Sequence, residues 1–480
     1  MSRFISHSRT LAGIFILSYL ALGASPSVLA ATTITVKLTP GENIQTAVNA
    51  APAGTTFVLT AGTYRMQSVK PKAYDVFEGQ GTAILNGSEV LTFEKESETS
   101  TLWVAAATVG APASGQCQEG HPLCGYDQDL FVDGSVQNPA SSLEGLTSGS
   151  WYLDRSTGKV YLPENPTGHV VELGMTQFAF CSNVPGVQVE YMIVEHYASP
   201  AQTGAVGCYK EGTGWIVNHV EARFNHGTGI GLGPAGQILH SYVHNNGQMG
   251  VAIQGGTGSK VIDNEISWNN YAGYERNWEA GGSKFWETTN LLVESNYVHD
   301  NNGNGLWTDC NNVGTVYQSN TVVNNLGIGI LHEISYNAVI SLNTVEGNHF
   351  DLISPLNLWS SEIVLANSQN VEVYGNTVEV PATNADGIGI LNELRGTGSL
   401  GVWVASNNNV HNNTITYLGS GGSSGMISYP GGPAVTGNQF DFNKYVLEDA
   451  GSLHWTWMKL LDFAQLQAAG QELHGAASIE

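Results

Sequence analysis

The sequence predicts an all-β solenoid, in which short parallel strands stack as successive coils. Three observations support this fold class: a short phrase that recurs along the chain, regular glycine-containing turns, and a composition that disfavours helices. The chain has 480 residues, of which 58 are glycine, and a glycine inside a helix costs about 0.5–1 kcal/mol relative to alanine. With 42% hydrophobic residues, the chain still has enough apolar side chains for a large core.

The recurring phrase is an asparagine, then any residue, then Val, Ile or Phe. It begins at Asn218, Asn264, Asn296, Asn320, Asn343, Asn376, Asn413 and Asn438, with Ser241 filling the gap after the first. Most steps between phrases are close to 23 residues and some are longer, as expected for stacked coils with loop insertions. We expect these asparagines to point inward and to hydrogen-bond turn backbone from coil to coil, which is a structural role.

A glycine-containing turn and a short β-branched strand follow each phrase. Residues 227–230, 303–306 and 327–330 are examples. No helical periodicity accompanies these segments, so they predict parallel strands that recur once per coil.

The segment after residue 40 adds a second signal for the fold. Residues 41–51 form an amphipathic helical stretch, which the strand 56–59 and the phrase Ala-Gly-Thr-Tyr at 61–64 follow. This opening resembles the right-handed parallel β-helix families with the pectin-lyase-like fold, and the resemblance extends over residues 40–93 and 175–445. It implies that the helix caps the open N-terminal coil, where backbone groups would otherwise remain unpaired.

Two segments lack the repeated phrase. Residues 95–174 contain strand-like pieces and are only loosely similar to insertions in some β-helix glycoside hydrolases, and residues 460–473 have the pattern of an amphipathic helix. The expected segments are a signal peptide (1–30), an N-terminal cap with the first coils (31–94), an inserted small β-domain (95–174), the main β-helix (175–445) and a C-terminal cap segment (446–480).

The first thirty residues have the build of a cleavable secretory signal. Arg3 and Arg9 precede an apolar run over 11–22, and small residues end the segment at Ala30. The run is shorter than the ~20 residues that a membrane span needs. We therefore expect a secreted protein, extracellular or periplasmic, without a membrane anchor.

The charge balance excludes some partners. The formal net charge is −24, only 12% of residues are charged, and the mean hydropathy is −0.08. So acidic a chain is a poor partner for nucleic acid or an anionic membrane surface. The hydropathy excludes a multi-span membrane protein.

Five cysteines fit an oxidising compartment. The best candidate pair is Cys117 with Cys124, Cys181 and Cys208 are a second pair on neighbouring turns of the chain, and Cys310 is left over. No Cys-x-x-Cys motif or histidine cluster appears, so a structural zinc site is not expected.

Candidate catalytic residues lie thirteen positions after the repeated residue. This column contains Gln254, Asp309 and Glu333. Side chains alternate along a strand, and the parity of the neighbouring apolar residues predicts that Asp309, Glu333 and Trp307 point outward while His332 points inward. The motif Gly-Ile-Gly-Ile-Leu-x-Glu occurs at 327–333 and again at 387–393, which predicts that Glu393 lies on the same outer column.

The long step between the phrases at 264 and 296 carries an insertion that gathers charges and aromatic rings. We expect it to form one wall of a cleft and to place Lys284 outward beside Asp309. Its candidate substrate-binding residues are Tyr274, Glu275, Arg276, Trp278 and Glu279.

Stacked outer carboxylates repel one another, which favours a functional role over a structural one. Neighbouring strands lie ~4.8 Å apart, so Asp309 and Glu333 are expected near the ~5–5.5 Å carboxyl separation of a retaining glycosidase. One carboxylate remains ionised as the nucleophile, and the other has a raised pKa and protonates the leaving oxygen. Trp307, Trp278 and Tyr274 are expected to stack on sugar rings.

Three functions remain open. The first is hydrolysis of a polysaccharide by the Asp309/Glu333 pair, without a cofactor. The second is a calcium-assisted lyase, as in several β-helix lyases, in which Asp309, Glu333 and Glu393 hold Ca²⁺ while Lys284 abstracts a proton. The third is a non-catalytic glycan-binding solenoid, since this fold hosts several activities. A capped solenoid needs no partner subunit, so a monomer is expected.

Overall fold

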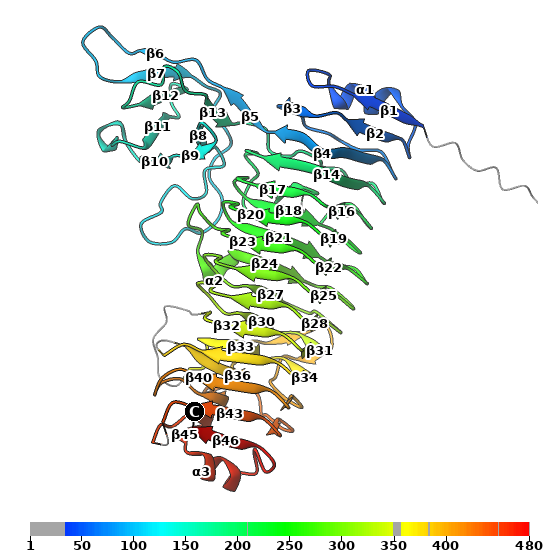
Figure 1. Ribbon diagram of the computed structural model, residues 1–480, viewed down its shortest axis with the longest axis vertical. Coiled ribbons are helices and arrows are strands. Elements are labelled where there is room, and N and C mark those ends of the chain that lie inside the picture. The colour runs from blue at the N-terminus through cyan, green and yellow to red at the C-terminus, as the bar shows by residue number, and fades with distance from the viewer. Residues whose placement is uncertain (1–33, 209, 349–356, 383–384, 450, 480) are drawn as a thin grey trace, which may run out of the picture. The chain divides into compact units, whose positions relative to one another are not determined.

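The computed structural model describes residues 34–479, apart from 209, 349–356, 383–384 and 450. These residues form a parallel β-helix, in which the chain winds repeatedly through two long sheets (Figure 1). The predicted solenoid is therefore confirmed, while the predicted signal peptide, 1–30, lies outside the described residues. No helix in the described part of the chain is long and apolar enough to cross a membrane.

The larger sheet has 24 strands, and most coils contribute two strands to it. Its strands are β1 (Thr35–Leu38), β2 (Thr56–Leu59), β3 (Gly62–Arg65), β4 (Val76–Asn86), β14 (Gln188–Glu195), β16 (Ile216–Asn218), β17 (Glu221–Arg223), β19 (Gln237–Leu239), β20 (Tyr242–His244), β22 (Lys260–Ile262), β23 (Glu265–Ser267), β25 (Leu292–Glu294), β26 (Tyr297–His299), β28 (Val316–Gln318), β29 (Thr321–Val323), β31 (Tyr336–Ser341), β32 (Thr344–Glu346), β34 (Gln369–Tyr374), β35 (Thr377–Val380), β39 (Asn409–His411), β40 (Thr414–Tyr417), β42 (Gln439–Asp441), β43 (Lys444–Leu447) and β46 (Ala476–Ile479).

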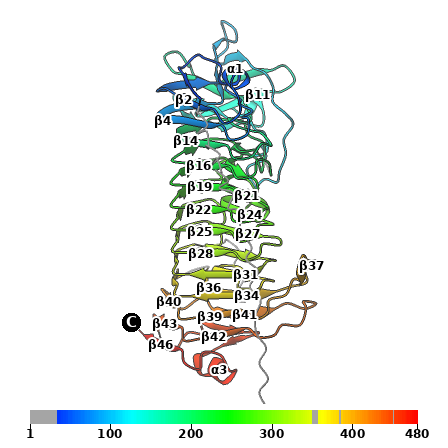
Figure 2. The same cartoon turned by 90° about the vertical axis from the view of Figure 1, so that its right-hand side faces the viewer.

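The second sheet has 11 strands and carries the candidate site. Its strands are β15 (Gly204–Val206), β18 (Thr228–Leu232), β21 (Met249–Gln254), β24 (Gly281–Trp286), β27 (Leu306–Asp309), β30 (Ile330–Glu333), β33 (Ser361–Ala366), β36 (Asp386–Asn392), β41 (Ser424–Ser428), β44 (Trp455–Trp457) and β45 (Leu460–Leu461). Figure 2 shows the strands of successive coils stacked side by side.

The core lies inside the coils and is built from columns of apolar side chains in register. One such column contains Val243, Ile266, Val298 and Val322, which pair from strand to strand and are fully buried. Because each strand is parallel to the next, one apolar position per repeat produces a continuous apolar stripe along the solenoid.

Buried asparagines form two ladders along the corners of the coils. Asn320 is typical, since its Nδ2 donates to Oδ1 of Asn343 at 3.0 Å and to the carbonyl of Val293 at 2.9 Å. The first ladder contains Asn264, Asn296, Asn320, Asn343, Asn376, Asn413 and Asn443. The second contains Asn225, Asn246, Asn269, Asn301, Asn325 and Asn348. The predicted structural role of the repeated asparagine is confirmed from Asn264 to Asn413. Asn443, and not Asn438, follows Asn413 in this ladder, and Asn438 instead accepts from the Asn408 N–H at 3.1 Å.

The first repeat differs from the prediction. The motif at 218–220 predicts that Val220 pairs with Val243, but in the structure Ala222 pairs with Val243. Asn218 therefore lies two residues before the ladder position. Val220 occupies the ladder position instead, and its backbone N–H donates to Oγ of Ser241 at 3.1 Å. The corner residue before a ladder asparagine adopts positive φ, for example +56° at Ser319, and the amide hydrogen bonds offset this strained corner.

Both ends of the solenoid carry caps. Helix α1 (Ile44–Ala50) begins after Asn43, whose side chain accepts from the Thr46 N–H, and it buries Ile44 and Val48 on the first coil. The predicted C-terminal helix is shorter than expected: α3 spans Phe463–Ala468, with a capping box between Asp462 and Gln465. Positive φ at Gly470 ends the helix, and β46 then adds a last parallel strand beside β43.

The inserted segment folds into two small sheets with their own apolar cluster. One sheet contains β6 (Glu94–Lys95), β7 (Trp103–Ala106), β10 (Asn138–Pro139), β11 (Ser150–Asp154) and β12 (Lys159–Leu162), and the other contains β5 (Ser88–Val90), β8 (Leu130–Val132), β9 (Ser135–Val136) and β13 (Val171–Gly174), with a 3₁₀ turn, η1, at Leu143–Gly145. Both predicted disulfides, Cys117–Cys124 and Cys181–Cys208, are present, and Cys310 is free.

Candidate active site

The two candidate carboxylates lie opposite each other on neighbouring strands. Asp309 ends β27 and Glu333 ends β30, and the two residues pair in register. The residues just before them, Thr308 and His332, point to the opposite, inner face of the sheet. Both are buried, and Oγ1 of Thr308 lies 2.7 Å from Nδ1 of His332. Burial lowers the pKa of His332 to about 3, so this imidazole is a neutral interior group. The predicted pairing and the inward position of His332 are confirmed.

Asp309 is held by a lysine on one oxygen. Nζ of Lys284, from β24, lies 3.0 Å from Oδ2 of Asp309 and 3.1 Å from Oε1 of Glu279. Among the described residues, Oδ1 of Asp309 has no hydrogen-bond partner. The Lys284 side chain therefore bridges two carboxylates, and it fixes the position of the Asp309 side chain.

Lys284 lies outward because its neighbour Phe285 points into the core and is fully buried. Its Nζ also lies 3.8 Å from the centre of the Trp307 ring and 3.4 Å from the carbonyl oxygen of Trp278. Lys284 is therefore engaged by two carboxylates, an aromatic ring and a carbonyl oxygen, which suits a role in positioning Asp309.

Glu333 is more deeply buried than Asp309. Its Oε1 lies 2.6 Å from Nη1 of Arg395, and its Oε2 accepts a hydrogen bond of 3.1 Å from Nε1 of Trp307. Burial raises the pKa of Glu333, and the nearby charge of Asp309 raises it further, while Arg395 and Lys284 oppose the shift. The pair therefore combines a carboxylate held by a lysine with a carboxyl group whose pKa is raised, which is the asymmetry of an acid and a nucleophile.

Arg395 was not identified from the sequence. It lies in the loop between β36 and the hairpin β37 (Thr397–Gly398) and β38 (Gly401–Val402). Contacts with the coil fix this hairpin: the Ser399 N–H donates to Oδ1 of Asn311 at 2.8 Å, and the hydroxyl of Tyr336 donates to the Gly401 carbonyl at 3.0 Å. One sequence feature points to Arg395: Lys and Arg residues are scarce in this acidic chain, so each of them is a candidate partner for a functional carboxylate.

Glu393 does not lie on the column of Asp309 and Glu333. The next residues in register after Glu333 are Ala366 and Leu391, so Glu393 is displaced by two positions and two strands. Its Oε1 accepts from Nε1 of Trp359 at 3.1 Å. The prediction was wrong because the register places Leu391, two residues before Glu393, on the column.

Two predicted sugar platforms are buried. Tyr274 is fully buried, and its hydroxyl lies 3.0 Å from Nε2 of His226. Trp307 is 4% exposed, with Lys284 over its ring. Neither ring presents a face to a ligand, so both predictions are corrected to positioning roles. Trp278 remains half-buried at the edge of the site.

The remaining predicted residues surround the site without joining it. Glu275 caps the four-residue helix α2 (Arg276–Glu279) by accepting from the Asn277 N–H. Arg276 donates to Oδ1 of Asn302 at 2.8 Å. Gln254 shares the column of Asp309, two strands away, and contacts Glu287 at 3.4 Å.

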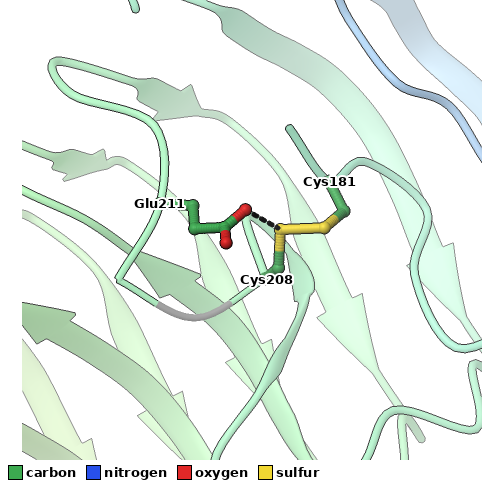
Figure 3. A group of neighbouring side chains, drawn as sticks. All are labelled: Cys181, Cys208 and Glu211. Atoms are coloured by element: carbon green, nitrogen blue, oxygen red, sulfur yellow. Dashed lines mark hydrogen bonds between the residues drawn. A yellow bond between two sulfur atoms is a disulfide. The ribbon is translucent and has the colours of Figure 1, made fainter. Parts of the chain in front are cut away.

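The carboxylates do not converge as calcium ligands. In the described ranges, the one group of three acidic, cysteine or histidine side chains close enough to share an ion is Cys181, Cys208 and Glu211 (Figure 3). Its two sulfur atoms are bonded to each other, so no thiolate is available there. At the candidate site, Lys284 and Arg395 already occupy the positions of counter-ions to Asp309 and Glu333.

Comparisons with known proteins define the fold. The family model described as a right handed beta helix region matches residues 204–378. The structure of XylC in complex with xylose has a TM-score of 0.66 and 15% identity over 84% of this chain and 80% of that chain. The A-module of the Azotobacter vinelandii mannuronan C-5 epimerase AlgE6 has a TM-score of 0.45 and 14% identity, over 91% of this chain and 92% of that chain. No curated protein sequence matches the chain. The chain therefore has the right-handed parallel β-helix fold.

Proposed function

We propose that the protein is a secreted glycoside hydrolase of the retaining type, with Asp309 as nucleophile and Glu333 as general acid and base. The observation that carries the proposal is the pairing of Asp309 and Glu333 on adjacent strands in unlike environments. Adjacent strands give the short carboxyl separation of retaining enzymes. The two disulfides support a location outside the cytoplasm.

The proposed reaction has two steps. Glu333 gives its proton to the glycosidic oxygen while Oδ1 of Asp309 attacks the anomeric carbon, which yields a glycosyl-enzyme ester and a free sugar hydroxyl. Glu333, now ionised, takes a proton from water, and the water oxygen attacks the same carbon and releases Asp309. Since Oδ1 of Asp309 is enclosed in the described structure, the proposal requires a side-chain movement when substrate enters.

A neutral glycan fits this site better than an acidic one. Lys284 and Arg395 are both engaged by protein carboxylates, so neither is free to bind a uronate. The similarity to XylC in its xylose complex supports a carbohydrate ligand at the level of the fold alone.

The test is glycan cleavage by the mature protein. Neutral and acidic polysaccharides are incubated with and without EDTA while reducing ends and ultraviolet absorbance are measured. We expect reducing ends without absorbance, insensitive to EDTA, and a loss of at least about 10³-fold in Asp309→Asn and Glu333→Gln. Asp263→Asn, at an exposed carboxylate, is the matched control.

Three results would contradict the proposal. Undiminished cleavage in both site variants would exclude the carboxylate pair, and absorbance that EDTA abolishes would favour the calcium-assisted lyase. Glycan retention with no turnover of any polysaccharide would favour a binding solenoid.

A further inference from the structure

A cavity of about 820 Å³ lies between the inserted domain and the coils, apart from the Asp309/Glu333 pair. The inserted domain contributes the loop 120–129, the segment 136–141 and the turn 151–156. The coils contribute His226, Tyr271 and Ala272. Ligand sites for small molecules and short oligomers have volumes of about 300–1,000 Å³.

The base of the cavity is a connected polar cluster. Oδ2 of Asp129 lies 2.8 Å from Nδ1 of His226 and accepts a hydrogen bond of 2.6 Å from the Tyr271 hydroxyl. Nε2 of His226 lies 2.7 Å from the Cys124 carbonyl oxygen. Asp129 is 8% exposed and lines the cavity. Its carboxylate, held by His226 and Tyr271, is a positioned acceptor there.

Aromatic rings form other parts of the wall. Tyr126 and Tyr152 are half-buried, and the Arg155 guanidinium lies 3.9 Å from the centre of the Tyr126 ring. Trp151 lies behind them, with Nε1 donating to the Gln137 carbonyl at 3.2 Å. Half-exposed aromatic rings beside amide and carboxylate groups match sugars, which present both apolar ring faces and hydroxyls.

The charges in the cavity select against an anionic ligand. The His226 imidazole is paired with Asp129 and buried, and Arg155 is engaged by the Tyr126 ring. Asp154, also in the lining, remains an anion because hydroxyls and N–H groups of Ser156 and Thr157 lower its pKa to about 2. An acidic sugar would therefore meet paired cations and a free anion.

We propose that this cavity is a second glycan-binding site, specific for a neutral oligosaccharide. Tyr271 and Ala272 line it, while Trp278 and Glu279, a few residues further along the same loop, contact Lys284 at the candidate active site. One short stretch of chain therefore links the wall of the cavity to the candidate active site. The proposal does not depend on Asp309 or Glu333 being catalytic.

Binding is tested by calorimetry with full-length mature protein that carries Glu333→Gln, which removes turnover. The probes are neutral oligosaccharides of two to six xylose, glucose, mannose or arabinose units, and oligogalacturonates of the same lengths. We expect one neutral series to bind. Ser141→Trp and Asn138→Trp, two lining positions exposed at the cavity, are each expected to lower its affinity at least tenfold. Ser135→Trp, exposed on β9 outside the lining, is the matched control and is expected to bind normally.

Near-ultraviolet circular dichroism identifies any variant that misfolds. If one filling variant misfolds, the affinity of the other filling variant tests the proposal. Absence of binding by every neutral series, preference for oligogalacturonate, or affinity unchanged in both filling variants would each overturn the proposal.

Discussion

Asp309 and Glu333 face each other in register across β27 and β30, yet each carboxyl group is held by a different cation. Lys284 lies 3.0 Å from Asp309, and Arg395 lies 2.6 Å from Glu333. Lys284 belongs to the preceding coil, whereas Arg395 comes from a loop beyond β36. The two carboxyl groups therefore have unlike surroundings: burial and the charge of Asp309 raise the pKa of Glu333, while Arg395 and Lys284 oppose the shift.

The pH profile is expected to be bell-shaped, with an alkaline limb set by loss of the Glu333 proton. Burial raises the pKa of Glu333 and Arg395 lowers it. Replacement of Arg395 by Met is therefore expected to move the alkaline limb upward, by about one pH unit. The measurement is kcat/KM against pH for both proteins, with Lys444→Met as a control for loss of a positive charge. A downward shift would contradict this assignment of the acid.

Lys284→Met is expected to destabilise the protein by about 3 kcal/mol. The change leaves Asp309 and Glu279 without their shared cation in a buried site, and removal of one partner from a buried ion pair costs about 3–5 kcal/mol. Denaturant unfolding monitored by tryptophan fluorescence measures the loss. Lys260→Met, at an exposed lysine on β22, is expected to have little effect, and equal stability of both variants would show that the Lys284 pair contributes nothing.

The inserted domain is expected to dock less firmly as pH rises. Burial lowers the pKa of His226, but contacts with Asp129 and the Cys124 carbonyl outweigh burial, so the pKa lies above its usual value of 6.5. A group with a raised folded pKa stabilises fully below its unfolded value, and the stabilisation disappears as pH rises through the folded pKa. His226→Gln is therefore expected to lower stability most near pH 6.

Limited proteolysis of the loop around residue 120 provides the measurement. The difference in cleavage rate between the unmodified protein and His226→Gln is expected to shrink between pH 6 and 9. A difference that grows with pH would contradict a protonated His226.

The sequence predicted the parts of the structure that depend on the repeat. Asp309 and Glu333 could be paired because regular coils preserve a fixed spacing from the ladder asparagine. Glu393 could not, because its strand is displaced by two residues relative to the column of Glu333, and no local pattern marks this shift. The burial of Tyr274 was equally hidden, because it depends on a bridge to Cys117 in the inserted domain, a contact between segments far apart in sequence.

The asparagine ladder supplies the last prediction. Asn320 accepts from the N–H and Nδ2 of Asn296 at 3.0 and 2.9 Å, and it donates to Asn343 and to a strand carbonyl. Asn320→Ala would leave several buried polar groups unpaired, at about 1–3 kcal/mol for each. We expect a loss of about 4 kcal/mol, whereas Asn138→Ala, at an exposed asparagine on β10, is expected to cost less than about 1 kcal/mol.

Hydrogen exchange distinguishes a ladder from independent hydrogen bonds. If the amides polarise one another along the stack, Asn320→Ala increases amide exchange in the coils on both sides, at Asn296 and Asn343 and beyond. If the bonds act independently, faster exchange is confined to the immediate partners of residue 320. Propagation over two or more coils is the expected result, because each amide both accepts and donates within one continuous chain of bonds.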